Sequence, residues 1–295
     1  MAENSNIEWT KHTFNPWIGC QKVGPGCDHC YAETWDARGL QGTATRWGPS
    51  AERTRTSVAN WRKPLAWDRA AGLAGERHRV FCASLADVFD NHASIDPQWI
   101  ADLWRLIAST PNLDWMLLTK RPGNIEKMLP DGWGRGWHNV WLGCTVVNQE
   151  EADRDIPKLL KVDASVRFLS MEPLLGPVKL LGGIDLVIVG GESGPNARPM
   201  HPDWARSLRD QCQDAGIPFF FKQWGEWAPA FHDPAPDGHV LRQTEQVAEF
   251  DSWVTEAFDP LRTAGVNWRR LGKKRSGRQL DGRTWDETPE ARHAR

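Results

Sequence analysis

The sequence is poor in several features that would place it in a specialised class of protein. Its 295 residues include one Tyr beside 18 Trp, and the formal net charge is only -2. No apolar run approaches the roughly 20 residues that a membrane-spanning helix requires. A strongly basic surface is also excluded, so any contact with nucleic acid must be made by a local patch. The Trp excess has two open interpretations, which are packing in the core and stacking on a ligand.

The start of the chain also lacks an export signal. The opening MAENSNIEWTKHTFNPW shows neither the basic start nor the apolar core of a signal peptide. We therefore expect a cytoplasmic protein with no membrane association. In a reducing compartment, the six cysteines are metal ligands, catalytic thiols or small buried side chains rather than a disulfide framework.

From residue 80 onward, short apolar runs alternate with amphipathic helical segments. Such runs, rich in Val, Ile, Leu and Phe, are typical of strands buried on both faces. The strands are predicted within 79–89, 114–122, 139–149, 166–176, 185–194 and 218–227, and the helices within 96–110, 148–162 and 201–216. This alternation indicates right-handed βαβ units and a parallel sheet. With HTFNPWIGC near the start as a further strand, about seven strands favour a parallel β/α barrel, partial or near-complete and TIM-barrel-like.

Polar residues follow each predicted strand. They are Ser84 and Asp87, Thr119 and Lys120, Thr145 and Asn148, Ser170 and Glu172, Glu192 and Ser193, and Lys222 and Gln223. The carboxyl ends of parallel barrel strands converge on one opening, here called the mouth, where active sites are built. Because six predicted strands each place a polar side chain at this end, we predict an active site at the mouth.

Some of these positions allow two interpretations. Glu172 and Lys222 end apolar strands, where an unpaired charge is costly, so they form either a salt bridge across the mouth or catalytic contacts with substrate. Cys144 is either a packing residue or a hydrogen-atom donor to a substrate radical. Gly190 and Gly191 open GGESGPNARP, which either receives a nucleotide phosphate or makes a tight turn.

The end of the chain departs from the strand–helix pattern. Residues 228–260 are rich in Pro, Gly and acids, which indicates an insertion or a small appended lobe. We therefore predict a barrel with an N-terminal cysteine loop over 1–227, and an insertion with a basic extension over 228–295.

The basic tail has two open interpretations. Between residues 269 and 283 its basic residues are Arg269, Arg270, Lys273, Lys274, Arg275, Arg278 and Arg283, against the single acid Asp281. The tail is a solvated hairpin, because LDGRTW contains an Asp-Gly turn, or a contact for the phosphates of a polyanion, flanked by Trp268 and Trp285.

The stretch WIGCQKVGPGCDHCYAE places Cys20, Cys27 and Cys30 in a loop rich in Gly and Pro. Zinc is one candidate, because Cys27 and Cys30 have zinc-knuckle spacing, Cys20 could be a third ligand, and His29, His12 or a distant Cys could be the fourth. A [4Fe–4S] cluster is the other, because each iron takes one thiolate and three thiolates leave one iron open. An open iron can bind a small molecule, and S-adenosylmethionine is the ligand that would make such a site an enzyme.

A cysteine loop directly after the first strand of an incomplete parallel barrel resembles the radical S-adenosylmethionine (radical SAM) superfamily. The common pattern there is Cys-x3-Cys-x-aromatic-Cys; CDHC matches its end, with His29 at the ring position, and the first gap is six residues here. The resemblance implies that Cys20, Cys27 and Cys30 hold a [4Fe–4S] cluster that binds S-adenosylmethionine. It also implies a one-electron reductant of the flavodoxin or ferredoxin type as partner.

The resemblance also implies where the cofactor lies. The superfamily binds the amino group of S-adenosylmethionine with a Gly-Gly-Glu-like motif at the end of its second strand, where this chain has ASLADVFD. Ser84 and Asp87 are the stand-ins there, and Thr119 and Lys120 at the next strand end belong to the same predicted cofactor site. The literal GGE at 190–192 is expected at the adenosyl or substrate end.

Nearly the whole chain further resembles a phage-associated three-cysteine family, in NPWIGC, GCDHCYAE, TKRP, SMEPLLGP, VIVGGESG, FFFKQWGEW and LDGRTWDE. The sequence thus predicts a radical SAM enzyme with a nucleic acid or nucleotide substrate, such as DNA that is modified or repaired. One alternative is a non-catalytic, zinc-binding phage protein that binds nucleic acid. Another is a barrel hydrolase that uses Glu172, Glu192 or Asp87 with a bound metal.

Overall fold

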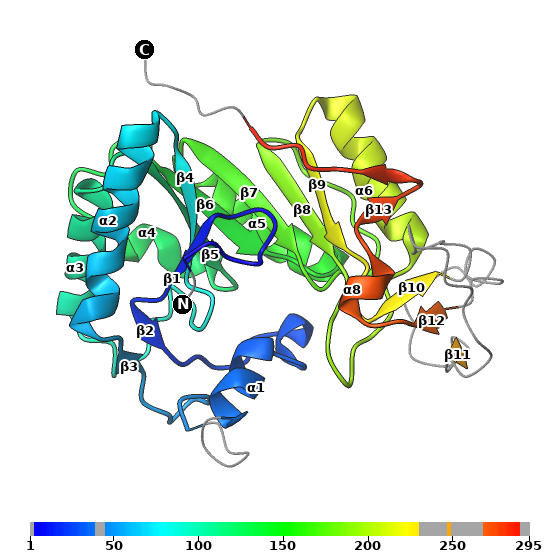
Figure 1. Ribbon diagram of the computed structural model, residues 1–295, viewed down its shortest axis with the longest axis horizontal. Coiled ribbons are helices and arrows are strands. Elements are labelled where there is room, and N and C mark those ends of the chain that lie inside the picture. Colours follow the sequence, from blue (N-terminus) through cyan, green and yellow to red (C-terminus); the bar gives the residue numbers. More distant parts are fainter. Residues whose placement is uncertain (1–2, 39–44, 230–246, 249–267, 290–295) are drawn as a thin grey trace.

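The structure of the protein, a computed structural model, describes residues 3–38, 45–229, 247–248 and 268–289. Its centre is one seven-stranded sheet in the order β1-β4-β5-β6-β7-β8-β9, with every neighbouring pair parallel. The sheet curls into half a barrel (Figure 1). Its strands are β1 (His12–Phe14), β4 (His78–Cys82), β5 (Leu113–Thr119), β6 (Val140–Thr145), β7 (Val166–Met171), β8 (Leu186–Gly190) and β9 (Phe219–Gln223). The predicted α/β class and partial parallel barrel are confirmed.

Helices follow most strands, as a βαβ pattern requires. The longer ones are α2 (Val58–Ala74), α3 (Pro97–Ala108), α5 (Gln149–Leu160) and α6 (Pro202–Ala215), and the shorter ones are α1 (Tyr31–Arg38), α4 (Ile125–Met128) and α8 (Lys273–Ser276). Short pieces complete this part of the chain, namely the 3-10 turns Pro25–Cys27 and Pro122–Asn124, and the strand pair β2 (Trp17–Ile18) and β3 (Thr54–Arg55). None of the described helices is long and apolar enough to cross a membrane.

The helix ends follow local sequence signals. Asp96 caps α3 by accepting a hydrogen bond from the Gln98 backbone N–H, and Pro97 occupies the first turn. Gly216 ends α6 in the left-handed conformation, at φ 64°. Helix α2 has comparable end signals in Ser57, which accepts a hydrogen bond from the Asn60 backbone N–H, and Gly75, which is left-handed at φ 65°. Its apolar period is obscured, because its buried positions include Asn60 and Pro64.

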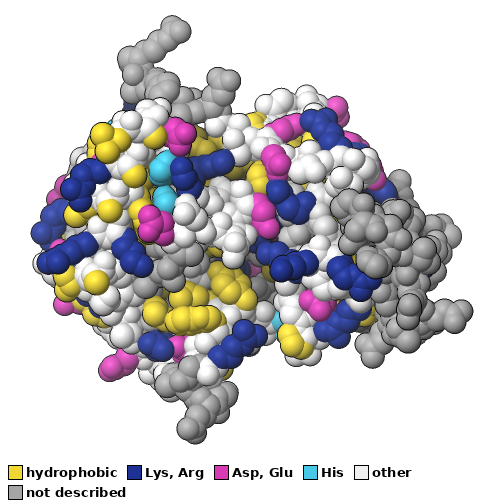
Figure 2. All heavy atoms as spheres, in the orientation of Figure 1, with side chains coloured by type: hydrophobic (Ala, Val, Ile, Leu, Met, Phe, Trp, Pro, Cys, Tyr) yellow, Lys and Arg dark blue, Asp and Glu magenta, His cyan; other side chains and the backbone are white. Residues whose placement is uncertain are grey.

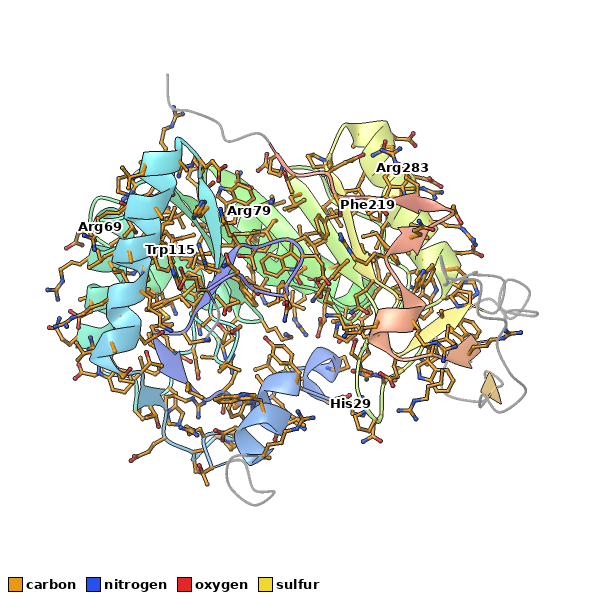
Figure 3. All side chains as sticks on the ribbon, viewed as in Figure 1. His29, Arg69, Arg79, Trp115, Phe219 and Arg283 are labelled. Atoms are coloured by element: carbon orange, nitrogen blue, oxygen red, sulfur yellow. The ribbon has the colours of Figure 1, made fainter. Side chains whose placement is uncertain are left out.

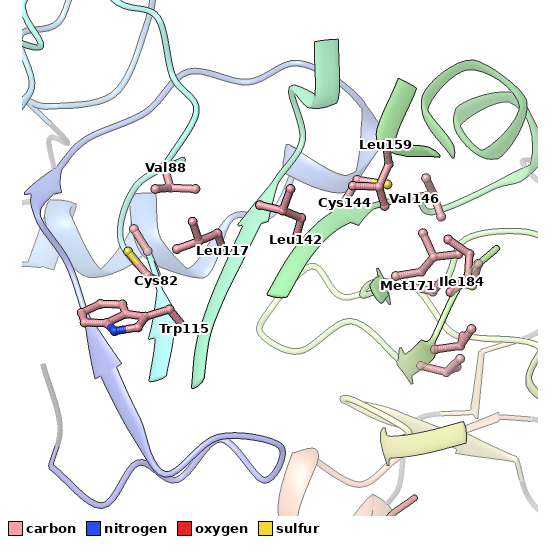
Figure 4. Close-up of a cluster of buried hydrophobic side chains, with 14 of the residues drawn as sticks. Cys82, Val88, Trp115, Leu117, Leu142, Cys144, Val146, Leu159, Met171 and Ile184 are labelled. Atoms are coloured by element: carbon pink, nitrogen blue, oxygen red, sulfur yellow. The ribbon is translucent and has the colours of Figure 1, made fainter. Parts of the chain in front are cut away.

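The two faces of the sheet bury different cores because side chains alternate along each strand. Leu117, Leu142, Cys144 and Leu159 belong to the larger core, which lies between the sheet and its helices (Figure 4). The smaller core fills the concave side, and its members include Trp9, Phe81, Met116, Trp141, Phe168, Leu186, Ile188 and Phe220. Side chains that lie on the same face of the sheet as this smaller core point into the half-barrel. Alternation along each strand thus decides which strand-end residues face the mouth.

Both edges of the sheet are covered by the ends of the chain. Glu3 forms an antiparallel bridge with His12 of β1. At the other edge, the Phe221 backbone N–H donates to the Trp285 carbonyl at 2.9 Å, and Phe220 bridges Asp286. Unpaired backbone groups of an exposed edge would otherwise invite pairing with other chains.

The basic tail contains the predicted hairpin. β13 (Gln279–Leu280) and β14 (Arg283–Thr284) pair antiparallel around Asp281 and Gly282, which both have positive φ. Before it, β12 (Trp268–Arg270) pairs with β10 (Trp227–Pro229) and β11 (Val247–Ala248). The rest of the predicted insertion, 230–246 and 249–260, lies outside the described residues.

A test of the concave core uses Gly143, because a Cβ there would meet the Phe168 ring at 2.4 Å. Phe168 is fully buried and cannot swing away. We expect Gly143→Ala to lower the free energy of unfolding by about 1–3 kcal/mol, measured by urea denaturation. Gly182→Ala, where a Cβ would meet nothing within 4 Å, is the control; equal losses in both variants would contradict this packing.

Candidate active site

The cysteine loop, residues 20–30, lies across the carboxyl ends of the strands. A Cβ at Gly24 would come within 2.4 Å of the Glu151 carboxylate, which follows β6. A Cβ at Gly26 would come within 2.7 Å of Val147 and within 3.9 Å of Pro173, which follows β7. The two glycines therefore let the loop backbone approach the mouth closely, as no bulkier residue would.

A carboxylate at the end of β8 anchors the middle of the loop. Glu192 Oε2 accepts hydrogen bonds from His29 Nδ1 at 3.1 Å and from Arg198 Nε at 2.8 Å. Arg198 also reaches the loop itself, donating to the Asp28 carboxylate at 3.0 Å and to the Pro25 carbonyl at 2.9 Å. Figure 3 shows His29 at the end of the loop, beside α1. Burial would raise the pKa of Glu192, but the bonds from Arg198 and His29 outweigh it and lower that pKa.

A second anchor holds the start of the loop. Arg121, just after β5, donates from Nη1 to Cys20 Sγ at 3.6 Å and from Nη2 to the Gln21 carbonyl at 2.9 Å. Burial and the nearby charge of Asp87 raise the pKa of the Cys20 thiol to about 11, although Arg121 acts in the opposite direction.

Asp87 is the hub of this second anchor. Its carboxylate accepts hydrogen bonds from the Thr119 hydroxyl at 2.6 Å and from the backbone N–H groups of Phe89 and Lys120, at 2.9 and 3.0 Å. Arg121 Nη1 donates to it as well, at 2.9 Å. These protein donors leave the Asp87 carboxylate little capacity to bind the amino group of a cofactor. Asp87 therefore holds the residues around the mouth in place.

The end of β4 meets α1 at the mouth. The hydroxyl of Tyr31 donates to the Ser84 carbonyl at 2.5 Å, and the Ser84 hydroxyl accepts from Asn15 at 2.9 Å. The Tyr31 side chain is nevertheless among the most exposed large hydrophobic groups of the described residues, as is Trp35 one turn later. Figure 2 shows hydrophobic side chains gathered in the hollow over α1.

Glu172 and Lys222 face the concave side and form an ion pair across the mouth. The pair links the ends of β7 and β9, with side chains only 14% and 15% exposed. The other carboxylate oxygen of Glu172, Oε1, is buried and accepts no hydrogen bond from the described residues. The predicted salt bridge is therefore present, and it leaves one acceptor atom for a ligand group.

The glycines after β8 serve close packing. A Cβ at Gly191 would lie 1.9 Å from the Trp224 carbonyl oxygen, so only glycine fits. A Cβ at Gly190 would press on the Glu172 side chain at 3.2 Å. Both residues thus let β8 lie against neighbouring backbone and side chains, which is the tight-turn interpretation.

Cys144 does not belong to the mouth. Its side chain is fully buried on the helix side of the sheet, beside Leu142 and Leu159 (Figure 4). Burial raises its pKa strongly. Alternation along β6 points it away from the concave side, so the predicted role as a hydrogen-atom donor gives way to packing.

The three loop cysteines are free thiols, and in this structure they do not form a site for a single metal ion. All three are free, with Cys27 buried and Cys20 and Cys30 half-buried. Across the described part of the chain, no set of at least three His, Cys, Asp or Glu side chains is arranged to hold a single ion. Zinc requires such convergence. In a [4Fe–4S] cluster each thiolate binds a different iron, so three free thiols are the donor set that such a cluster takes from a protein when one iron stays open.

Sequence reasoning missed several residues of this site. Tyr31, Arg121 and Arg198 lie outside the set of polar strand-end residues, and the bond from His29 to Glu192 is not predicted by its position between the cysteines. The sequence signals for them are the single Tyr of the chain, directly after Cys30, and the places of Arg121 in TKRP and Arg198 in GGESGPNARP.

The fold and the site together define an α/β half-barrel that carries a three-cysteine loop over its strand ends. The chain belongs to the family described as protein of unknown function DUF5131, whose model matches residues 4–289. No curated protein matches the sequence.

Among solved structures, similarity extends to spore photoproduct lyase. A double mutant with bound AdoMet and dinucleoside spore photoproduct is 13% identical at a TM-score of 0.43, over 88% of this chain and 68% of that one. A lyase complexed with dinucleoside spore photoproduct is 10% identical at a TM-score of 0.40, over 86% of this chain and 66% of that one. These values are too low to transfer a substrate or a reaction.

The ion pair at the mouth gives a test of stability. We expect Lys222→Met to lower the free energy of unfolding by about 3 kcal/mol, because it leaves the Glu172 carboxylate desolvated and unpaired. The double variant Lys222→Met/Glu172→Leu should regain most of that loss. Urea denaturation of both variants measures the difference, and additive losses would show that the two side chains do not interact.

Proposed function

We propose that this protein is a radical SAM enzyme that holds a [4Fe–4S] cluster on Cys20, Cys27 and Cys30. The observation that carries the proposal is the anchored three-cysteine loop over the mouth of a parallel half-barrel. When bound, such a cluster supplies one electron to S-adenosylmethionine and so starts radical chemistry.

The chain's own residues then have separate tasks. Glu192 and Arg198 hold the middle of the loop, and Arg121 holds its start. At the floor of the mouth, the free oxygen of Glu172 accepts a hydrogen bond from a donor group of the cofactor or substrate. Lys222 pairs with that carboxylate and balances its charge in a largely buried place.

The substrate that we propose is a nucleic acid or nucleotide. Within the basic tail, Arg270 and Arg278 are engaged with backbone carbonyls, whereas Lys273 and Lys274 of α8 are exposed. Figure 2 shows Lys and Arg side chains on the side of the molecule where Figure 1 places α8. Exposed aromatic groups on α1 and cations on α8 are the combination that single-stranded nucleic acids bind.

The cluster is tested on protein purified and reconstituted without oxygen. We expect about four irons and as many sulfides per chain, and formation of 5′-deoxyadenosine from S-adenosylmethionine under a strong reductant, measured by chromatography. Changing Cys20, Cys27 or Cys30 to Ser should abolish both the iron content and the product.

Cys144→Ala is the matched control, because that thiol lies in the core and should leave iron content unchanged. One zinc per chain without acid-labile sulfide would overturn the proposal and favour a structural zinc site, whose loss unfolds the domain.

The substrate class is tested by binding of a labelled single-stranded oligonucleotide across a salt series. Because each phosphate contact contributes about 0.7 to the slope of log K against log salt, Lys273→Ala/Lys274→Ala should reduce that slope by about 1.4. Arg62→Ala/Lys63→Ala on α2, a second exposed basic pair, is the control. No binding by the unchanged protein, or equal slopes in both variants, would reject a nucleic acid bound at α8.

A further inference from the structure

Arg121 is placed to act on Cys20 through charge as well as geometry. Its side chain is only 9% exposed, and its guanidinium donates to Cys20 Sγ at 3.6 Å. The same nitrogen donates to Asp87 at 2.9 Å, and Nε lies 3.8 Å from Asp90. A guanidinium cannot lose its proton in a protein, so this contact brings a permanent positive charge to the sulfur.

The position of Arg121 is fixed by a buried chain of alternating charges. Arg53 Nε donates to Asp90 at 2.8 Å, and both of these side chains are fully buried. Asp90 faces Arg121, which in turn pairs with Asp87, and Asp87 is held by Thr119. The charges of the two guanidinium and two carboxylate groups cancel, so this row of ion pairs next to Cys20 has no net charge.

A group bound at Cys20 changes that balance. A thiolate ligand adds negative charge at this end of the chain, and reduction of a cluster adds one electron more. A hydrogen bond and a fixed cation beside a ligand sulfur stabilise the reduced state, which is how surrounding residues set the potential of iron–sulfur centres. Among the hydrogen bonds of the described residues, a charged donor reaches the sulfur of Cys20 but not that of Cys27 or Cys30.

We propose that Arg121 is a positioning residue that raises the reduction potential of the cluster through Cys20. This inference rests on the proposed function, since it requires the cluster. Arg121 contacts neither substrate nor cofactor in this scheme; it acts by stabilising the added electron through the ligand sulfur.

The experiment is a redox titration of the reconstituted protein, followed by electron paramagnetic resonance, without S-adenosylmethionine. We expect Arg121→Met to shift the one-electron equilibrium at least tenfold toward the oxidised cluster, which is about 59 mV more negative. Arg121→Lys keeps the charge but loses the planar fork, so its potential should lie between those of the two other proteins. Arg77→Met breaks the Arg77–Asp114 pair at the opposite end of β5 and should leave the potential unchanged.

The outcomes separate this inference from the proposed function. Failure of the unchanged protein to bind iron and sulfide overturns both. Normal cluster content with the same potential in unchanged protein, Arg121→Met and Arg121→Lys overturns the role of Arg121 alone. If Arg121→Met fails to bind the cluster, the Arg121→Lys variant alone tests the inference. A reduction potential equal to that of the unchanged protein would then reject a role for the hydrogen bond from the Arg121 guanidinium.

Discussion

The arrangement of the candidate site depends on one carboxylate, that of Glu192. It is buried at the end of β8, and it binds both His29 of the cysteine loop and Arg198, which in turn bonds to Pro25 and Asp28. A buried carboxylate without partners would be costly, so these cationic and polar donors are required by its position. The same bonds hold the Gly- and Pro-rich loop in place. The Glu192 carboxylate thus gains partners from the loop and from Arg198, and the loop is held in place by that carboxylate.

The parallel sheet decides which residues can take part. Because side chains alternate along each strand, Glu172 and Lys222 point to the concave side while Cys144 points to the helices. Gly191 lets the end of β8 come against the Trp224 carbonyl, which brings Glu192 to the place where the loop crosses. The site is therefore formed by the alternation of side chains along the strands and by close contacts between backbone segments, rather than by a local sequence motif.

Much of the fold could be predicted from the sequence. Six apolar runs after residue 80 became β4 to β9, and the segments at 96–110, 148–162 and 201–216 became α3, α5 and α6. Their caps, Asp96 and Gly216, act within a few residues and are therefore visible locally. Helix α2 was not predicted, because its buried face includes Asn60 and Pro64 and so does not show a clear apolar period. The burial of these two residues depends on the elements that pack against them.

The sequence by itself determined the number and order of the parallel strands, the cysteine loop after the first of them, and the polar strand ends that meet at the mouth. These follow from hydrophobic period and spacing, which are properties of neighbouring residues. Only the tertiary structure decided that Asp87 is occupied by protein donors and that Arg121 reaches Cys20. Arg121 and Cys20 are far apart in the chain. They meet only because the parallel sheet brings the cysteine loop and the carboxyl end of β5 to the same end of the half-barrel.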